Sequence, residues 1–165
     1  ISMDEWNVWY AWYRPSSVTD GIYAALALHM LMEEAEKSGV ALACHFQAVN
    51  EGMMCVKPDR VTLTAQGQVF SRMNRWHMGN RLCSASQEAV VTADREGRVS
   101  ATVVNAAFRS EKPVDFSAFG PCSEAVLLSS ETVLPPSEFT VTDVLEQAAG
   151  GTFQMPPHSV LFLRF

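Results

Sequence analysis

Residues 4–10 of the chain have the sequence Asp-Glu-Trp-Asn-Val-Trp-Tyr, in which two carboxylates open an aromatic and apolar run. Such a run is typical of a β-strand, and charged side chains within one are rarely buried unless they are paired or have a function. A carboxylate at the end of a strand beside aromatic rings suits the cleavage of glycosidic bonds. The acid can stabilise an oxocarbenium-like transition state, and flat rings can hold a sugar. The alternative is that Glu5 forms a structural ion pair and that the tryptophans belong to the core.

The next forty residues complete a βαβ pattern. Thr19-Asp20 offers a helix N-cap, and apolar residues at helical spacing predict a helix over residues 21–38. Residues 40–46 form a short, unbroken apolar run, which is typical of a parallel strand covered on both faces. Together with a strand in residues 1–10, these segments predict two parallel strands joined by a helix.

The rest of the chain changes character near residue 82. Residues 51–60 have no periodicity and are expected to be irregular, whereas residues 64–78 show the pattern of an amphipathic helix. Residues 94–97 suit a hairpin turn. We therefore expect two domains, residues 1–82 with alternating strands and helices and residues 83–165 as an antiparallel sandwich. The strands predicted in the second domain cover residues 88–93, 98–105, 124–130 and 158–165.

Composition excludes several classes of partner. Of the 165 residues 48% are hydrophobic, so the chain is expected to fold, and its net charge of −6 argues against binding nucleic acid or an anionic membrane. The strongly apolar stretch 22–32 is too short to span a bilayer, and no secretion signal opens the chain. The four cysteines include no Cys-x-x-Cys pair, so we expect no metal site and reduced thiols in a cytoplasmic protein.

Three segments resemble glycoside hydrolase family 51, the α-L-arabinofuranosidases. Residues 4–10 look like the signature that ends strand seven of the family's barrel. Residues 43–50 (Ala-Cys-His-Phe-Gln-Ala-Val-Asn) are similar to the segment after strand eight, and residues 155–160 look like the family's closing strand. The resemblance implies an α/β plus all-β chain, with the last βα units of a (β/α)8 barrel followed by a jelly-roll-like β-sandwich.

The resemblance also implies site residues. Glu5 matches the catalytic nucleophile, Trp9 a ring that lines the sugar subsite, and Gln47 a side chain that hydrogen-bonds the furanose. Regular strand alternation would place Asn7 and Trp9 on the same side as Glu5, where Asn7 could hold the Glu5 carboxylate or its loop. Trp9 could instead be core and Gln47 a loop or capping residue. His45 lies in an apolar run, where a hydrogen-bonded core histidine is the commoner outcome.

A retaining glycosidase needs a second carboxyl as acid/base, which the family supplies from an Asn-Glu pair that precedes the nucleophile in sequence. Only four residues precede Glu5, and Asn50-Glu51 does not match the family position. The resemblance therefore implies the C-terminal part of an enzyme that acts on arabinan or arabinoxylan oligosaccharides without cofactor or metal. We expect the chain to be inactive alone, and the rest of the barrel, or further copies in a homo-oligomer, to be its protein partner.

Two other interpretations fit the same residues. The chain could be a non-catalytic carbohydrate-binding or assembly module, with Trp9 and Trp12 as stacking platforms. It could also belong to a related barrel glycosidase of another specificity, such as a β-xylosidase or an endoglucanase.

Overall fold

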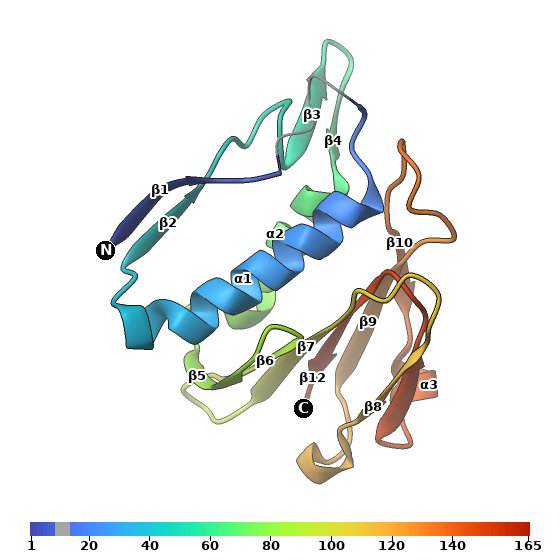
Figure 1. Ribbon diagram of the computed structural model, residues 1–165. Coiled ribbons are helices and arrows are strands. Elements are labelled where there is room, and N and C mark those ends of the chain that lie inside the picture. The colour runs from blue at the N-terminus through green and yellow to red at the C-terminus, as the bar shows by residue number, and fades with distance from the viewer. Residues whose placement is uncertain (9–13) are drawn as a thin grey trace.

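The first part of the chain forms a parallel βαβ unit, as predicted (Figure 1). The structure is a computed structural model that describes residues 1–8 and 14–165. β1 (Ser2–Trp6) and β2 (Leu42–His45) pair in parallel and are joined by α1 (Val18–Ser38). The predicted N-cap at Thr19-Asp20 is wrong by two residues, because Ser17 is the N-cap and its backbone N–H donates to the Asp20 carboxylate at 2.8 Å.

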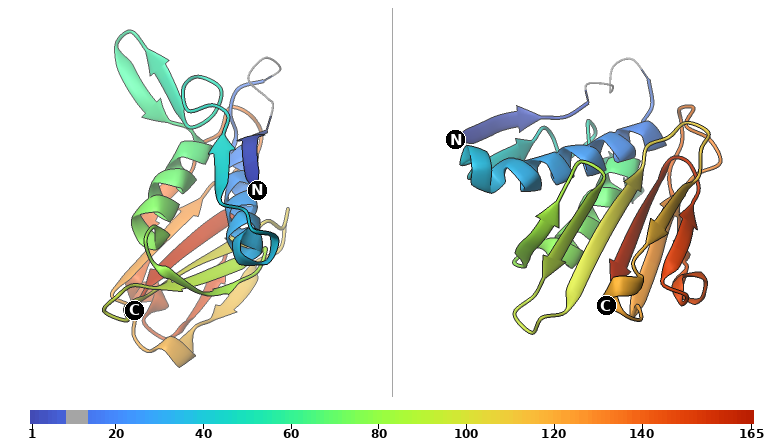
Figure 2. Two further views of the ribbon diagram at one scale, coloured as in Figure 1. Left: turned by 90° about the vertical axis from the view of Figure 1, so that its left-hand side faces the viewer. Right: turned by 60° about the horizontal axis from the view of Figure 1, so that its bottom comes forward.

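The two parallel strands are more exposed than their sequence predicts. Leu42 is 56% exposed and Ile1 is 77% exposed, and no residue of β1 or β2 is fully buried. The expectation that residues 40–46 are covered on both faces is therefore wrong for this chain. The helices cover one face of the pair, and no described element covers the other (Figure 2).

The largest sheet has six strands in the order β10-β9-β12-β7-β6-β5, and every neighbouring pair is antiparallel. All four strands predicted in the second half belong to it, and Asp94 closes the predicted β6–β7 turn by accepting from the backbone N–H of Glu96 and of Arg98. Two strands of the sheet were not predicted. The strands are β5 (Arg81–Ala85), β6 (Ala89–Ala93), β7 (Val99–Asn105), β9 (Glu124–Ser129), β10 (Thr140–Asp143) and β12 (Ser159–Arg164).

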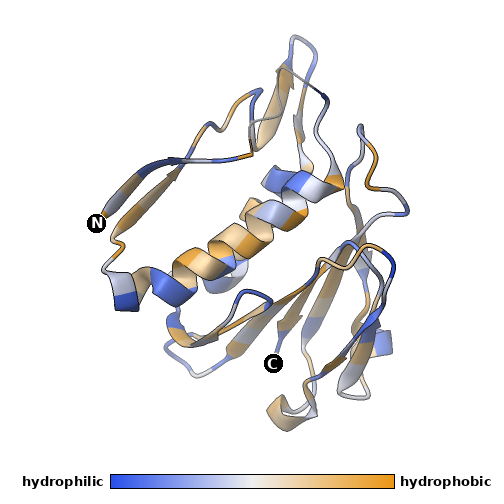
Figure 3. Cartoon of the chain, viewed as in Figure 1, coloured by the Kyte–Doolittle hydropathy of each residue, from blue (hydrophilic) through white to orange (hydrophobic). Residues whose placement is uncertain are grey.

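Both faces of this sheet are buried, and the alternation along β12 separates them. Val160 and Phe162 share a cluster with residues of α1 and of α2 (Ala65–His77), the helix predicted for residues 64–78. Leu161 and Leu163 face a second cluster on the opposite side. Figure 2 shows the two helices on one face of the sheet, and Figure 3 shows the largely hydrophobic middle of α1. The helices and the sheet therefore share one core across residue 82, where the domain boundary remains a prediction.

Shorter elements complete the molecule. The second cluster is closed by three elements that the sequence did not reveal, namely β8 (Lys112–Asp115), α3 (Leu145–Ala148) and β11 (Thr152–Met155). A short 3-10 turn, η1 (Ser117–Phe119), follows β8. Antiparallel β8 and β11 form a separate two-stranded sheet. A further hairpin, β3 (Met54–Lys57) with β4 (Arg60–Leu63), replaces the irregular stretch expected over residues 51–60. That expectation was wrong because short, largely exposed strands leave little apolar alternation in a sequence.

Candidate functional site

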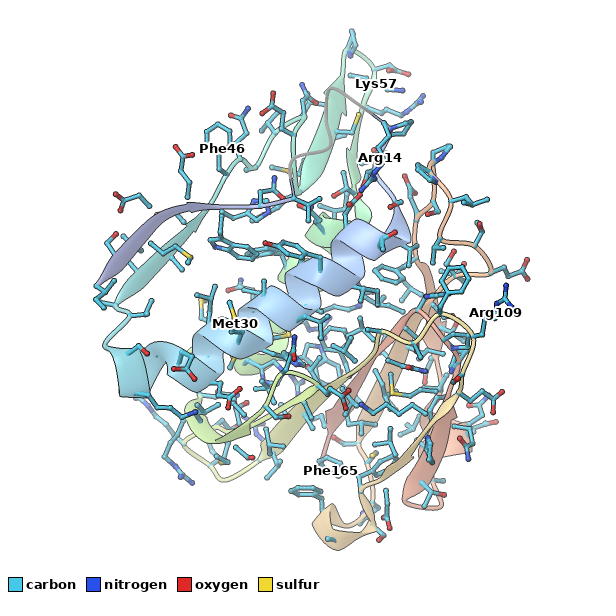
Figure 4. The ribbon with its side chains drawn as sticks, in the orientation of Figure 1. Arg14, Met30, Phe46, Lys57, Arg109 and Phe165 are labelled. Carbon is cyan, nitrogen blue, oxygen red and sulfur yellow. The ribbon has the colours of Figure 1, made fainter. Side chains whose placement is uncertain are left out.

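The carboxyl ends of β1 and β2 bring Glu5 and Gln47 to the same edge. The backbone N–H of Phe46 donates to the Trp6 carbonyl at 3.1 Å, which joins the two chain segments where the strands end. Phe46 marks this edge in Figure 4. Glu5 and Gln47 are both exposed, and no hydrogen bond or ion pair of their side chains is found among the described residues. Trp9, the ring expected at the sugar subsite, lies outside the described residues.

Asn7 points toward α2 and is held there by several hydrogen bonds. Its Nδ2 donates to the Glu51 carbonyl at 2.8 Å, and its Oδ1 accepts from Gln66 Nε2 at 2.9 Å. Trp6 also contacts α2, although regular alternation would place it opposite Asn7. The predicted alternation fails here because β1 ends at Trp6. In the described residues Asn7 contacts the loop at Glu51 and makes no hydrogen bond to Glu5.

Gln66 connects Asn7 to His45 and thereby fixes the histidine tautomer. Gln66 is fully buried, and its Oε1 lies 3.0 Å from His45 Nε2. Because the amide nitrogen of Gln66 donates to Asn7, its oxygen must accept from His45, so Nε2 carries the imidazole proton. Nδ1 of His45 is then an acceptor, buried and without a partner in the part of the chain that is described. Burial lowers the pKa of His45, which keeps the ring neutral.

Three rings pack beneath this network. Trp6 stacks on Phe70 with centroids 5.6 Å apart, and His45 meets both rings edge-on at 5.0 Å. The strand ends thus pack against α2 through aromatic contacts as well as through hydrogen bonds. Sequence reasoning missed Gln66 as a site residue. The sequence does contain a sign of this role. Helical spacing places the polar Gln66 on the same face as the apolar residues Val69, Phe70 and Met73.

The loop after β2 folds back onto the start of α2. Thr64 caps the helix by accepting from the Gly67 N–H at 3.2 Å, and its hydroxyl donates to the Gly52 carbonyl at 2.5 Å. Gly52 lies so close to the Gln47 carbonyl that a Cβ there would overlap it. Residues 47–53 are therefore fixed relative to both strand ends.

The described residues supply carboxylate and amide chemistry at this edge. Among them, no group of three His, Cys, Asp or Glu side chains could hold a metal ion. None of the helices in residues 1–8 and 14–165 has the length and apolar character needed to cross a bilayer. The edge therefore presents the exposed Glu5 carboxylate and the exposed Gln47 amide, on strand ends that are held in place by contacts with α2.

We expect Gln66→Leu to lower the free energy of unfolding by about 2 kcal/mol, because it leaves the His45 Nε2–H without a partner and removes one of the two hydrogen bonds that Asn7 Oδ1 accepts. Urea denaturation followed by tryptophan fluorescence measures the change. The matched control is Gln87→Leu, at an exposed position where the structure shows no side-chain hydrogen bond, and it should be nearly neutral. Equal effects of the two substitutions would contradict the bridging role of Gln66.

No family model and no curated protein matches the chain. Its fold is similar to that of a family 51 α-L-arabinofuranosidase from Bifidobacterium longum, with a TM-score of 0.71 and 15% identity over 99% of this chain and 42% of that one. The thermostable family 51 α-L-arabinofuranosidase from Thermotoga petrophila gives a TM-score of 0.69 and 18% identity over 100% and 43% of the two chains. The match is to the C-terminal portion of the family 51 enzymes.

Other glycoside hydrolases share the same arrangement. The catalytic domain of a family 30 xylanase C from Talaromyces cellulolyticus gives a TM-score of 0.65 and 12% identity over 99% of this chain and 40% of that one. The chain thus spans about 40% of the length of these three enzymes. At these identities the likeness concerns the fold, and it confirms the resemblance to family 51 at that level. A complete barrel and the jelly-roll connections remain predictions.

Proposed function

We propose that the chain is the C-terminal part of a retaining glycoside hydrolase that removes terminal α-L-arabinofuranosyl units from arabinan- or arabinoxylan-derived oligosaccharides. In this proposal residues 1–82 belong to the barrel and residues 83–165 to the sandwich. The observation that carries it is the position of Glu5 beside Gln47 at the carboxyl end of a parallel βαβ unit. Active groups of (β/α)8 barrels lie at this end of the strands. The four free cysteines support a reducing, cytoplasmic location.

Glu5 would act as the nucleophile. Its carboxylate oxygen attacks the anomeric carbon, and the bond to the leaving oxygen breaks as that oxygen takes a proton from a second carboxyl. Water, deprotonated by the same second carboxylate, then displaces Glu5 and releases the sugar. Gln47 would hydrogen-bond the furanose hydroxyls, and Trp9 would line the subsite. Asn7 would keep the loop at Glu51 in place beside the strand end.

The second carboxyl would come from another part of the barrel. It must lie about 5–5.5 Å from the nucleophile in a retaining enzyme. Exposed apolar side chains of Ile1, Met3 and Leu42 along β1 and β2 support this, because neighbouring strands of a closed barrel would cover them. The barrel partner is the remainder of the enzyme, and further copies in a homo-oligomer are the alternative.

The decisive experiment uses a substrate that needs no acid. Dinitrophenolate leaves without protonation, so dinitrophenyl α-L-arabinofuranoside should attach one pentosyl unit to Glu5 of the 165-residue chain. The adduct should accumulate because the base that would activate water is absent. Mass spectrometry of peptides locates it. Glu5→Gln should abolish labelling, whereas the matched control Asp4→Asn, one residue away and also exposed, should retain it.

Three results would contradict the proposal. A label on another carboxylate would remove Glu5 from the mechanism. Steady, Glu5-dependent release of nitrophenol from an ordinary nitrophenyl arabinofuranoside by this chain alone would show that no second segment is needed. Absence of any label, with sugar binding retained, would favour the non-catalytic module.

A related glycosidase of other specificity is the second candidate. It is favoured by the family 30 xylanase, whose TM-score of 0.65 lies close to the values of the arabinofuranosidases. Labelling with the dinitrophenyl β-xyloside separates the two candidates. Faster labelling by the xyloside than by the arabinofuranoside would select the second.

A further inference from the structure

A separate pocket lies where three loops meet at one end of the six-stranded sheet. The loops follow β7, β9 and β11, and they lie on the right-hand side of Figure 1. The pocket has a volume of about 590 Å³ and uses no residue of the Glu5 edge. Its lining includes Phe108, Arg109, Glu131 and His158.

An exposed aromatic platform forms one wall of the pocket. Phe108 is 66% exposed, and the His158 ring meets it edge-on with centroids 5.3 Å apart. The Arg109 guanidinium lies 5.7 Å from the Phe108 ring, and Figure 4 shows it at the edge of the molecule. The Phe108 ring therefore offers a flat apolar surface on which a ligand can stack.

The two loops that form this wall are held by a buried asparagine. Asn105, at the end of β7, donates from Nδ2 to the carbonyls of Ser110 at 3.0 Å and Pro156 at 2.9 Å. Its Oδ1 accepts from the Ala107 N–H at 3.1 Å. The Ser159 hydroxyl adds a second bond to the Pro156 carbonyl at 2.6 Å. The platform is therefore preorganised, so a ligand would not have to order these loops on binding.

The polar groups around the platform carry both signs of charge and both hydrogen-bond roles. Arg109 donates, the Glu131 carboxylate accepts, and the hydroxyls of Ser129 and Thr140 can do either. The positive charge of Arg109 and the negative charge of Glu131 cancel, so the pocket does not favour a ligand with net charge. A sugar ring has an apolar C–H face and a rim of hydroxyls, and this combination matches an aromatic surface edged by such groups.

We propose that this pocket is a binding site for a neutral oligosaccharide, independent of Glu5. The backbone of His158 supports a role for its side chain. His158 has φ 52, in the left-handed region that favours glycine, and residues held there cluster at binding sites. The histidine ring, which glycine would lack, widens the platform on one side of Phe108.

The test is an assigned ¹H–¹⁵N spectrum of the 165-residue chain titrated with arabinotriose and with xylotriose. Saturable shifts are expected at Phe108, Arg109, Glu131 and His158. Phe108→Ala should weaken binding about tenfold or more, and Phe108→Tyr should restore most of it. The matched control is Phe119→Ala, which removes a 47% exposed ring on η1 and should leave the affinity unchanged. Glu131→Ala is a second disruptive variant, placed on a different loop.

The outcomes separate this proposal from the proposed function. Shifts that persist in Glu5→Gln and vanish in Phe108→Ala support the site whether or not Glu5 is a nucleophile. Shifts produced by inorganic phosphate or by an oligoalanine peptide but not by the sugars would overturn it. The absence of saturable shifts at these residues would also overturn the proposal. So would an equal loss of sugar affinity in Phe108→Ala and in Phe119→Ala.

Discussion

Acidification from pH 7 to pH 5 is expected to lower the free energy of unfolding by about 4 kcal/mol, about 2 kcal/mol from each of two buried histidines. Burial lowers the pKa of His29 and of His77 to about 4, against 6.5 for an ordinary histidine. Between pH 6.5 and 4 the unfolded chain therefore binds protons that the folded chain does not. The free energy of unfolding therefore decreases as the pH is lowered from 6.5 to 4. Below pH 4 the two histidines cause no further decrease.

Burial explains why the two rings resist protonation, because the oxygens that contact them could also accept hydrogen bonds from charged rings. His77 lies between two threonine hydroxyls, with Nδ1 2.9 Å from Thr92 and Nε2 2.6 Å from Thr102. These contacts attach α2 to the sheet. His29 on α1 has one partner, the Gln87 carbonyl at 3.1 Å, and no partner for Nε2 among the described residues. Acid should therefore separate the helix layer from the sheet first.

Urea denaturation at several pH values measures this dependence. His77→Gln keeps a donor and an acceptor but removes the titrating group, so it should remove about half of the change between pH 7 and pH 5. Unpaired carboxyl groups titrate mainly below this interval and contribute little to it. A free energy of unfolding that is the same at pH 7 and pH 5 would contradict the assignment.

Four of the six strands of the large sheet could be predicted because buried apolar residues follow one another along them, whereas β5 and β10 are largely exposed. β12 is the clearest case, since Val160 and Phe162 fill one core while Leu161 and Leu163 fill the other. An unbroken apolar run is the pattern of a strand covered on both faces. The same rule failed for β2, whose apolar residues are exposed in this chain. In the proposed function, the missing cover of β2 would come from the rest of the barrel.

The candidate site could be predicted only in part. Resemblance pointed to Glu5 and Gln47, and the parallel pairing of β1 with β2 followed from the βαβ pattern. The bridge from Asn7 to Gln66 joins residues 59 positions apart, and helical spacing places Gln66 on the apolar face of its helix without indicating its partner. The platform of Phe108 and His158 likewise joins two loops through a single ring contact. Such pairs depend on tertiary packing, which a local pattern does not encode.

Gly67→Ala should destabilise the fold by about 3 kcal/mol, because a methyl group has no room there. A Cβ on Gly67 would overlap the carbonyl oxygen of Met53 and approach the Leu63 side chain to 3.2 Å. The first contact is with backbone, so the loop must move as a unit. The higher helix propensity of alanine, about 1 kcal/mol, offsets only part of this cost. Thermal and urea denaturation of the variant measure the change.

The matched control is Gly150→Ala, where nothing lies within 4 Å of the new methyl group and the effect should lie between zero and about 1 kcal/mol of stabilisation. Moving Met53 in Gly67→Ala should also disturb its neighbour Gly52, whose carbonyl accepts from Thr64, and Glu51, whose carbonyl accepts from Asn7. Glu5 should therefore be labelled more slowly in Gly67→Ala than in Gly150→Ala at a temperature where both are folded. Equal stability and equal labelling in the two variants would mean that the loop is not seated on α2, and the bracing of the Glu5 edge would lose its structural basis.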